Sequence, residues 1–173
     1  MATANLSFNS LESNPYNSVL TLMDTRSNIA DPRDPNGLKS RTFVYDFDPF
    51  HLAIDFNDLP YIILELPTID YGIKNLKGSR KQISYTHRIT VRTAKRGASN
   101  ARTDIGKTDM LNICDDMQQM FNSVSVKQAF MNLNLYNFDL RKISVNTYSV
   151  DQKYLYEAVY ELTYETPFKD VQA

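Results

Sequence analysis

The 173-residue chain contains one cysteine, Cys114, no tryptophan and five glycines. One cysteine cannot form an internal disulfide bond, and no second cysteine or histidine stands near it at the spacing of a zinc site. The scarcity of glycine leaves no glycine-rich loop of the kind that cradles a phosphate. No segment approaches 18 consecutive apolar residues, and no charged amino-terminal region precedes an apolar core, so membrane spanning and secretion are disfavoured. We expect the chain to work in a reducing cytoplasm.

The strongest pattern that is present runs from Tyr154 to Tyr164. Even-numbered positions of this segment are aromatic or apolar, whereas Glu157, Glu161 and, one step beyond, Glu165 occupy odd-numbered positions. This alternation predicts a long β-strand with one packable face and one charged face. Because an exposed ribbon of tyrosine would invite aggregation, we expect the strand inside a sheet or at an edge that another subunit covers.

Periodicity and turn residues predict the remaining elements. The order helix, strand, strand, helix, strand, strand predicts an α+β domain with a four-stranded, mainly antiparallel sheet and helices packed on one face. The expected elements are a helix over 15–26, irregular extended structure over 42–56, strands over 61–66 and 82–92, a helix over 104–122, a turn at 123–126, an apolar stretch over 130–135, and a hairpin of strands 141–150 and 153–165 that turns at Asp151 and Gln152.

No group of residues in the sequence has the pattern of a catalytic, cofactor-binding or metal-binding site. His87 falls on the apolar side of the alternating strand, which favours a packed, hydrogen-bonded histidine over a general base. Cys114 lies within an apolar helical stripe and is interpreted as a small core residue. The carboxylates of Glu157, Glu161 and Glu165 are interpreted as a solvated or lumen-facing stripe, because no metal-binding histidines accompany them.

Charge is segregated along the chain. Residues 70–102 carry nine basic side chains and one acidic one, whereas residues 1–60 carry four basic and eight acidic side chains, and 103–173 carry six and ten. Three interpretations of the basic segment stay open: a solvated hairpin, docking between identical subunits, and contact with DNA. The candidates for a subunit interface are Lys74, Lys77, Arg80, Lys81, Lys95 and Arg96.

The order of these patterns resembles the tail terminator, or tail completion, proteins of long-tailed bacteriophages. The resemblance covers about residues 59–166, from the Leu59-Pro60 step and apolar strand through the alternating strand and the helix to the tyrosine-rich final strand. Recurring features of that family are a first strand of the type "F/L-P-x-apolar" and a last strand of the type "Y-x-Y". We accordingly treat residues 1–58 as an amino-terminal extension and 167–173 as a tail.

The resemblance implies a structural virion protein rather than an enzyme, without a cofactor or a membrane partner. Such proteins form a hexameric ring on the last ring of the tail tube, end tube elongation and present a surface to the head-completion or connector proteins. DNA passes through the ring, and Glu157, Glu161 and Glu165 are the candidates for a lumen-facing stripe. The alternatives are another neck protein, such as a head-completion stopper or adaptor, and a cytosolic α+β enzyme or ligand-binding module.

Overall fold

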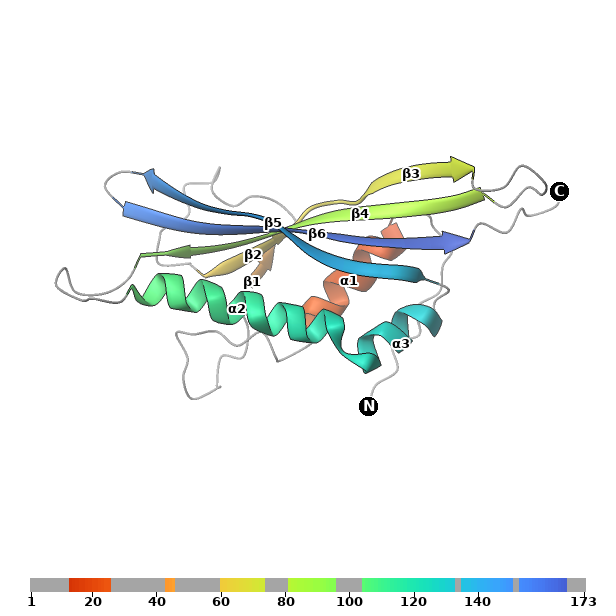
Figure 1. Ribbon diagram of the computed structural model, residues 1–173, viewed down its shortest axis with the longest axis horizontal. Helices are drawn as coiled ribbons and strands as arrows, with labels where there is room; N and C mark the ends of the chain where they lie inside the picture. The colour runs from red at the N-terminus through yellow and green to blue at the C-terminus, as the bar shows by residue number, and fades with distance from the viewer. Residues whose placement is uncertain are drawn as a thin grey trace.

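The computed structural model describes residues 13–25, 43–45, 60–73, 81–95, 104–132, 135–150 and 153–167. Within these ranges, three helices lie on one face of a six-stranded sheet (Figure 1). The helices are α1 (Ser13–Thr25), α2 (Ile105–Asn122) and α3 (Val124–Asn132). The strands are β1 (Phe43–Tyr45), β2 (Tyr61–Leu64), β3 (Thr68–Ile73), β4 (Lys81–Ala94), β5 (Tyr136–Val150) and β6 (Lys153–Pro167).

The sheet is antiparallel except at one margin. Its order is β1-β2-β4-β6-β5, and β3 also pairs with β4. Strands β2 and β3 lie along successive parts of the same side of β4, with Leu64 opposite Ile89 and Thr68 opposite Thr86. Pro67 stands between them, and proline interrupts a ladder because it has no N–H to donate. The pair β1–β2 is parallel. Figure 1 shows the strong twist of the sheet, because the vertical order of the strands inverts from one end of the picture to the other.

The register between β4 and β6 gives the sheet its two chemically different faces. Tyr85 lies opposite Tyr164, and Ile89 lies opposite Tyr160, on the face toward the helices. One step along each strand, Arg88 lies opposite Glu161 on the other face, which we call the outer face. Side chains alternate between faces along a strand, so this register sends the tyrosines inward and the charges outward together.

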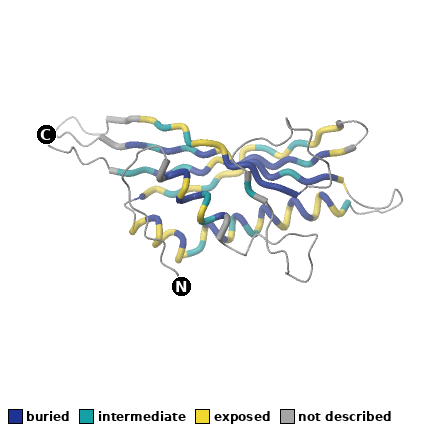
Figure 2. The backbone as a smooth tube through the Cα atoms, turned by 180° about the vertical axis from the view of Figure 1, so that it is seen from behind, coloured by how far each residue is buried: buried dark blue, intermediate teal, exposed yellow. Residues whose placement is uncertain are grey.

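The hydrophobic core fills the space between the sheet and the helix layer. From α2 it includes Ile113, Met117 and Phe121, and from α1 it includes Val19 and Met23, all of them buried. Figure 2 shows the buried stretches in dark blue along the central strands and along the sheet-facing side of the helices. Helix α1 therefore packs into the same core as the segments that follow Pro60.

Helix α2 begins in close contact with the end of β4. Asp104 caps the helix, because its Oδ1 accepts a hydrogen bond from the N–H of Gly106 at 3.0 Å. The Thr93 hydroxyl of β4 donates to the carbonyl of Gly106 at 2.6 Å. A β-carbon at position 106 would lie 1.8 Å from the carbonyl oxygen of Ala94, so the helix can approach this closely only with glycine there.

The structure confirms the α+β class, the helices over 15–26 and 104–122, and the strands over 61–66, 82–92, 141–150 and 153–165 as elements in those places. The final strand, β6, lies inside the sheet between β4 and β5, which is one of the two positions that its tyrosine-rich face predicted. The sheet has more strands than the predicted four, because β1 and β3 join it. The turn expected at 123–126 is wrong: only Ser123 separates α2 from α3. The hairpin turn at Asp151 and Gln152 and the segment 46–56 lie outside the described residues.

Replacement of Phe121 by alanine tests the packing of helix against sheet. Phe121 is fully buried in the core that contains Tyr160 and Tyr164, so Phe121→Ala should lower the free energy of unfolding by about 3 to 5 kcal/mol. Leu111, on the same helix, is 45% exposed, so Leu111→Ala serves as the matched control and should cost about 1 kcal/mol or less. Urea denaturation of both variants measures the difference. Equal losses would contradict the packing.

Candidate functional site

The outer face is the first candidate surface, because it carries the carboxylates of β6. Glu157 lies opposite Arg92, Glu161 lies opposite both Arg88 and Arg141, and Glu165 lies opposite Ser84. The three carboxylates do share one face of the strand, as the alternation predicted. Their surroundings differ, however, so they do not act as one stripe.

Glu157 is buried and held by a network of side chains. It is 6% exposed, and its Oε2 accepts a hydrogen bond from Nε of Arg92 at 2.8 Å. Its Oε1 accepts from the hydroxyl of Tyr148 at 3.0 Å and from Nδ2 of Asn146 at 3.3 Å. The hydrogen bond to Glu157 raises the pKa of Tyr148, because the phenol donates to a carboxylate. This corrects the interpretation of Glu157 as a solvated or lumen-facing carboxylate: it is a structural anchor between β4, β5 and β6.

Glu161 and Glu165 belong instead to a mainly acidic part of the outer face, where Glu161 is exposed and Glu165 is half-buried. Five carboxylates and two guanidinium groups lie in this part. They come from β3, β4, β5, β6 and the segment between β2 and β3. Arg88 forms an ion pair with Glu65 at 3.8 Å, and both side chains are more than half exposed. An exposed pair of this kind adds little stability, so the patch is a surface charge pattern rather than a fold element. The members of this acidic patch are Glu65, Asp70, Asp139, Glu161 and Glu165, with Arg88 and Arg141 among them.

The edge strand β5 is the second candidate surface. It is 15 residues long, and among the described strands it pairs only with β6. Two irregularities interrupt its register, one between Tyr136 and Asp139 and one between Lys142 and Ser144. Asn137 occupies the first with a φ of 54°, a left-handed conformation that asparagine tolerates, and its side chain donates to Glu165. From Ser144 to Val150 the register with β6 is unbroken, and this half carries no charge.

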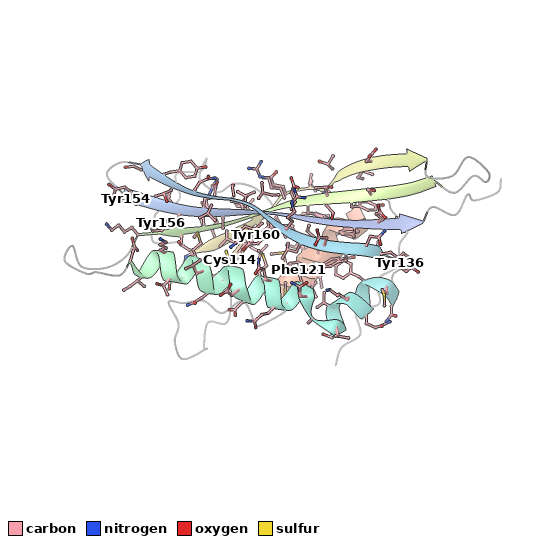
Figure 3. All side chains as sticks on the ribbon, viewed as in Figure 1. Cys114, Phe121, Tyr136, Tyr154, Tyr156 and Tyr160 are labelled. Carbon is pink, nitrogen blue, oxygen red and sulfur yellow. The ribbon has the colours of Figure 1, made fainter. Side chains whose placement is uncertain are left out.

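Apolar side chains are exposed along β5. Tyr136 is 43% exposed, Ile143 45%, Val145 54% and Tyr148 45%. Figure 3 shows Tyr136 at one end of the sheet and Tyr154, on the neighbouring strand, at the other. An open edge presents unpaired N–H and C=O groups, and the uncharged half of β5, from Ser144 to Val150, is a template for another strand. The β5 edge is therefore a surface that a partner would cover.

Most of the basic residues predicted as subunit-interface candidates lie outside the described residues. Lys74, Lys77, Arg80 and Arg96 are outside them, and only the backbone of Lys81 is described, at the start of β4. Lys95 is exposed, and its Nζ lies 5.2 Å from the centroid of the Tyr154 ring. Lys95 therefore makes a cation–π contact within the chain.

His87 is buried in the core, as the sequence indicated. Its Nδ1 lies 3.3 Å from the carbonyl oxygen of Glu65, and its Nε2 lies 2.7 Å from the hydroxyl of Tyr164. Because a carbonyl only accepts, Nδ1 carries the proton and Nε2 accepts from Tyr164. Burial lowers the pKa of His87 to about 4, and the bond to Glu65 offsets part of that effect. The ring is thus a neutral core residue that joins β4 to β6.

Cys114 is a core residue of α2 that faces β6. Burial raises the pKa of its thiol, and burial with the nearby thiol raises the pKa of the Tyr160 phenol. Figure 3 shows Cys114 and Tyr160 close together between α2 and the sheet. Neither group is poised for proton transfer at neutral pH, and the core assignment of Cys114 is confirmed.

In the described part of the chain, no three histidine, cysteine, aspartate or glutamate side chains gather where a metal ion would bind. No helix there is long and apolar enough to span a membrane. No protein-family model matches the chain, and no curated protein matches its sequence.

Replacement of Glu157 by glutamine tests the buried network. The change removes the carboxylate that Arg92 contacts in a site of low exposure, so Glu157→Gln should lower the free energy of unfolding by about 2 kcal/mol. The matched control is Glu161→Gln on the same strand and face, where exposure predicts a change within about 0.5 kcal/mol. Thermal or urea unfolding compares the two. If Glu161→Gln proved as costly as Glu157→Gln, the distinction between them would be lost.

Titration of stability tests the neutral state of His87. The unfolded imidazole titrates near 6.5 and the folded one at about 4, so the unfolded chain binds a proton first as the pH falls. His87 therefore contributes stability that is fully present above about pH 6.5 and is lost toward pH 4, by about 2 to 3 kcal/mol between pH 7 and 4.5. The measurement is urea unfolding at both pH values in a His51→Gln background, where His87 is the only imidazole.

His87→Gln in the same background is the comparison, because it removes the titrating ring and keeps a polar side chain. The loss of stability between pH 7 and 4.5 should shrink by the amount assigned to His87. An identical loss with and without His87 would contradict the neutral, buried assignment.

Proposed function

We propose that this chain is a structural virion protein that forms a ring, of six copies, on the end of a bacteriophage tail tube. The ring ends tail elongation and offers its other surface to the head-completion or connector proteins. It performs no catalysis. The order of elements in the described part supports the proposal, since the antiparallel pairs β3–β4 and β5–β6 stand in sequence before and after a helix that covers one face of the sheet.

The observation that carries the proposal is the outer side of β5, which pairs with no other strand in the described part of the chain. A protein that worked as a monomer would need to protect a 15-residue edge strand with exposed Ile143, Val145 and Tyr148. Natural edges are blunted by charges and bulges, and β5 has these only in its first half, around Arg141 and Lys142. The second half is regular and uncharged, as expected of a strand that another copy of the chain covers.

The acidic patch supports a role at a channel. DNA adheres to lysine and arginine, and carboxylates repel its phosphates, so a channel wall with excess negative charge lets DNA pass. Glu161 and Glu165 lie in a patch of five carboxylates and two guanidinium groups. We assign this part of the outer face to the channel. Glu157 takes no part in it, because Arg92 neutralises it.

Deletion of the gene from the phage that carries it tests the proposed function. Without a terminator, tube subunits continue to add, so lysates should contain overlong tails without heads, visible by negative-stain electron microscopy. Expression of the wild-type chain in trans should restore tails of uniform length. Tails of normal length beside heads that leak DNA would identify a head-completion stopper instead and contradict the proposal.

A further inference from the structure

We propose that copies of the chain meet edge to edge, with β5 of one copy lying beside β3 of the next. This inference rests on the proposed function, because it names the two surfaces by which subunits of the ring associate. It goes beyond that function by assigning the contact to particular residues, and it replaces the basic segment 74–96 as the main docking element.

The two strands occupy different, opposite margins of the sheet. The order of pairing places β5 at one margin and β3, beside β4, at the other. Among the described strands, none pairs with the outer side of either. A contact between two different surfaces is heterologous, and repetition of such a contact forms a ring when the rotation between copies closes on itself. Pairing of β5 with a second β5 would instead form a two-fold dimer and leave the β3 margin open.

Strand direction agrees with the proposed contact. β3 is antiparallel to β4, β4 to β6, and β6 to β5, so β3 and β5 run in opposite directions. Copies related by rotation about an axis along the strands keep these directions, so β5 meets the neighbour's β3 as an antiparallel partner. The antiparallel pattern within each chain then continues across the contact, where backbone N–H and C=O groups find partners.

The side chains at the two margins are complementary. Leu66, where β2 gives way to β3, is 71% exposed, and Val145 of β5 is 54% exposed. Asp70 and Arg141 are also exposed, point to the outer face and have no ion pair with another described residue. The register irregularity between Lys142 and Ser144 turns Val145 to the face of the sheet opposite to that of Arg141. An antiparallel register that sets Asp70 opposite Arg141 therefore brings the charged pair together on the outer face, while Leu66 and Val145 add exposed apolar surface to the same two margins.

Disulfide trapping in the full chain tests this contact. Asp70→Cys and Arg141→Cys are introduced together, and mild oxidation is followed by electrophoresis without reductant. The native Cys114 is buried and does not compete. The double variant should give a ladder of covalent oligomers that ends at the ring, whereas each single variant should stay monomeric. The matched control pairs Arg141→Cys with Asp115→Cys on the exposed side of α2, and it should give no ladder.

A charge exchange adds an independent readout. Arg141→Asp places two acidic side chains together at every contact, so the protein concentration at half-assembly should rise by at least about tenfold. Asp70→Arg added to Arg141→Asp should restore assembly. Failure of the second change to restore it would overturn the pairing of these residues.

The outcomes separate this inference from the proposed function. Dimers of the Arg141→Cys variant alone would show that β5 pairs with β5 and would overturn the contact. Rings of wild-type mass that give no ladder would also overturn it, while the proposed function would stand. A chain that stays monomeric alone and on tail tubes would contradict both the β5–β3 contact and the proposed function.

Discussion

The long register between β4 and β6 is the constraint on which the rest of the structure depends. It runs without a break from Gln82 opposite Pro167 to Ala94 opposite Leu155. A slip of one residue would turn Tyr160 and Tyr164 out to solvent and bring Glu161 into the core, so burial of one face fixes the pairing strongly. Two hydrogen bonds between β4 and β6 stabilise this register. His87 bonds to Tyr164 on the face toward the helices, and Arg92 bonds to Glu157 on the outer face.

That register also divides the surface into parts with different tasks. The face of the sheet toward the helices packs against α1, α2 and α3. The outer face and the two margins of the sheet are therefore the surfaces on which partners can bind. On the outer face, Glu157 belongs to the fold, whereas Glu161 is exposed and Glu165 is half-buried. At the margins, β5 and β3 are open along their outer sides among the described strands. The ring that we propose uses both: margins join the copies, and the acidic patch lines the channel.

Local patterns predicted much of the fold, and the reasons are specific. The alternation over 82–92 and 154–164 gave the correct faces, including the buried position of His87, because half-buried strands have a period of two. Helix α3 was missed although Ser123 caps it and Val126 and Phe130 share a face, which is a helical signal over only nine residues. The pairing of Glu157 with Arg92 could not be predicted from the sequence, because two residues 65 positions apart become neighbours only through the register of the strands. The start of β5 at Tyr136 was in the sequence, since Tyr136, Phe138 and Leu140 alternate with polar residues.

Native mass spectrometry with electron microscopy of the purified chain distinguishes a ring from other assemblies, because a ring has both a defined mass and a defined symmetry. We predict closed particles of six chains, each of 19.9 kDa, with six-fold symmetry and a central channel, formed by the chain alone or on tail tubes. A monomer under all conditions, or a two-fold dimer that buries β5 against β5, would contradict this prediction.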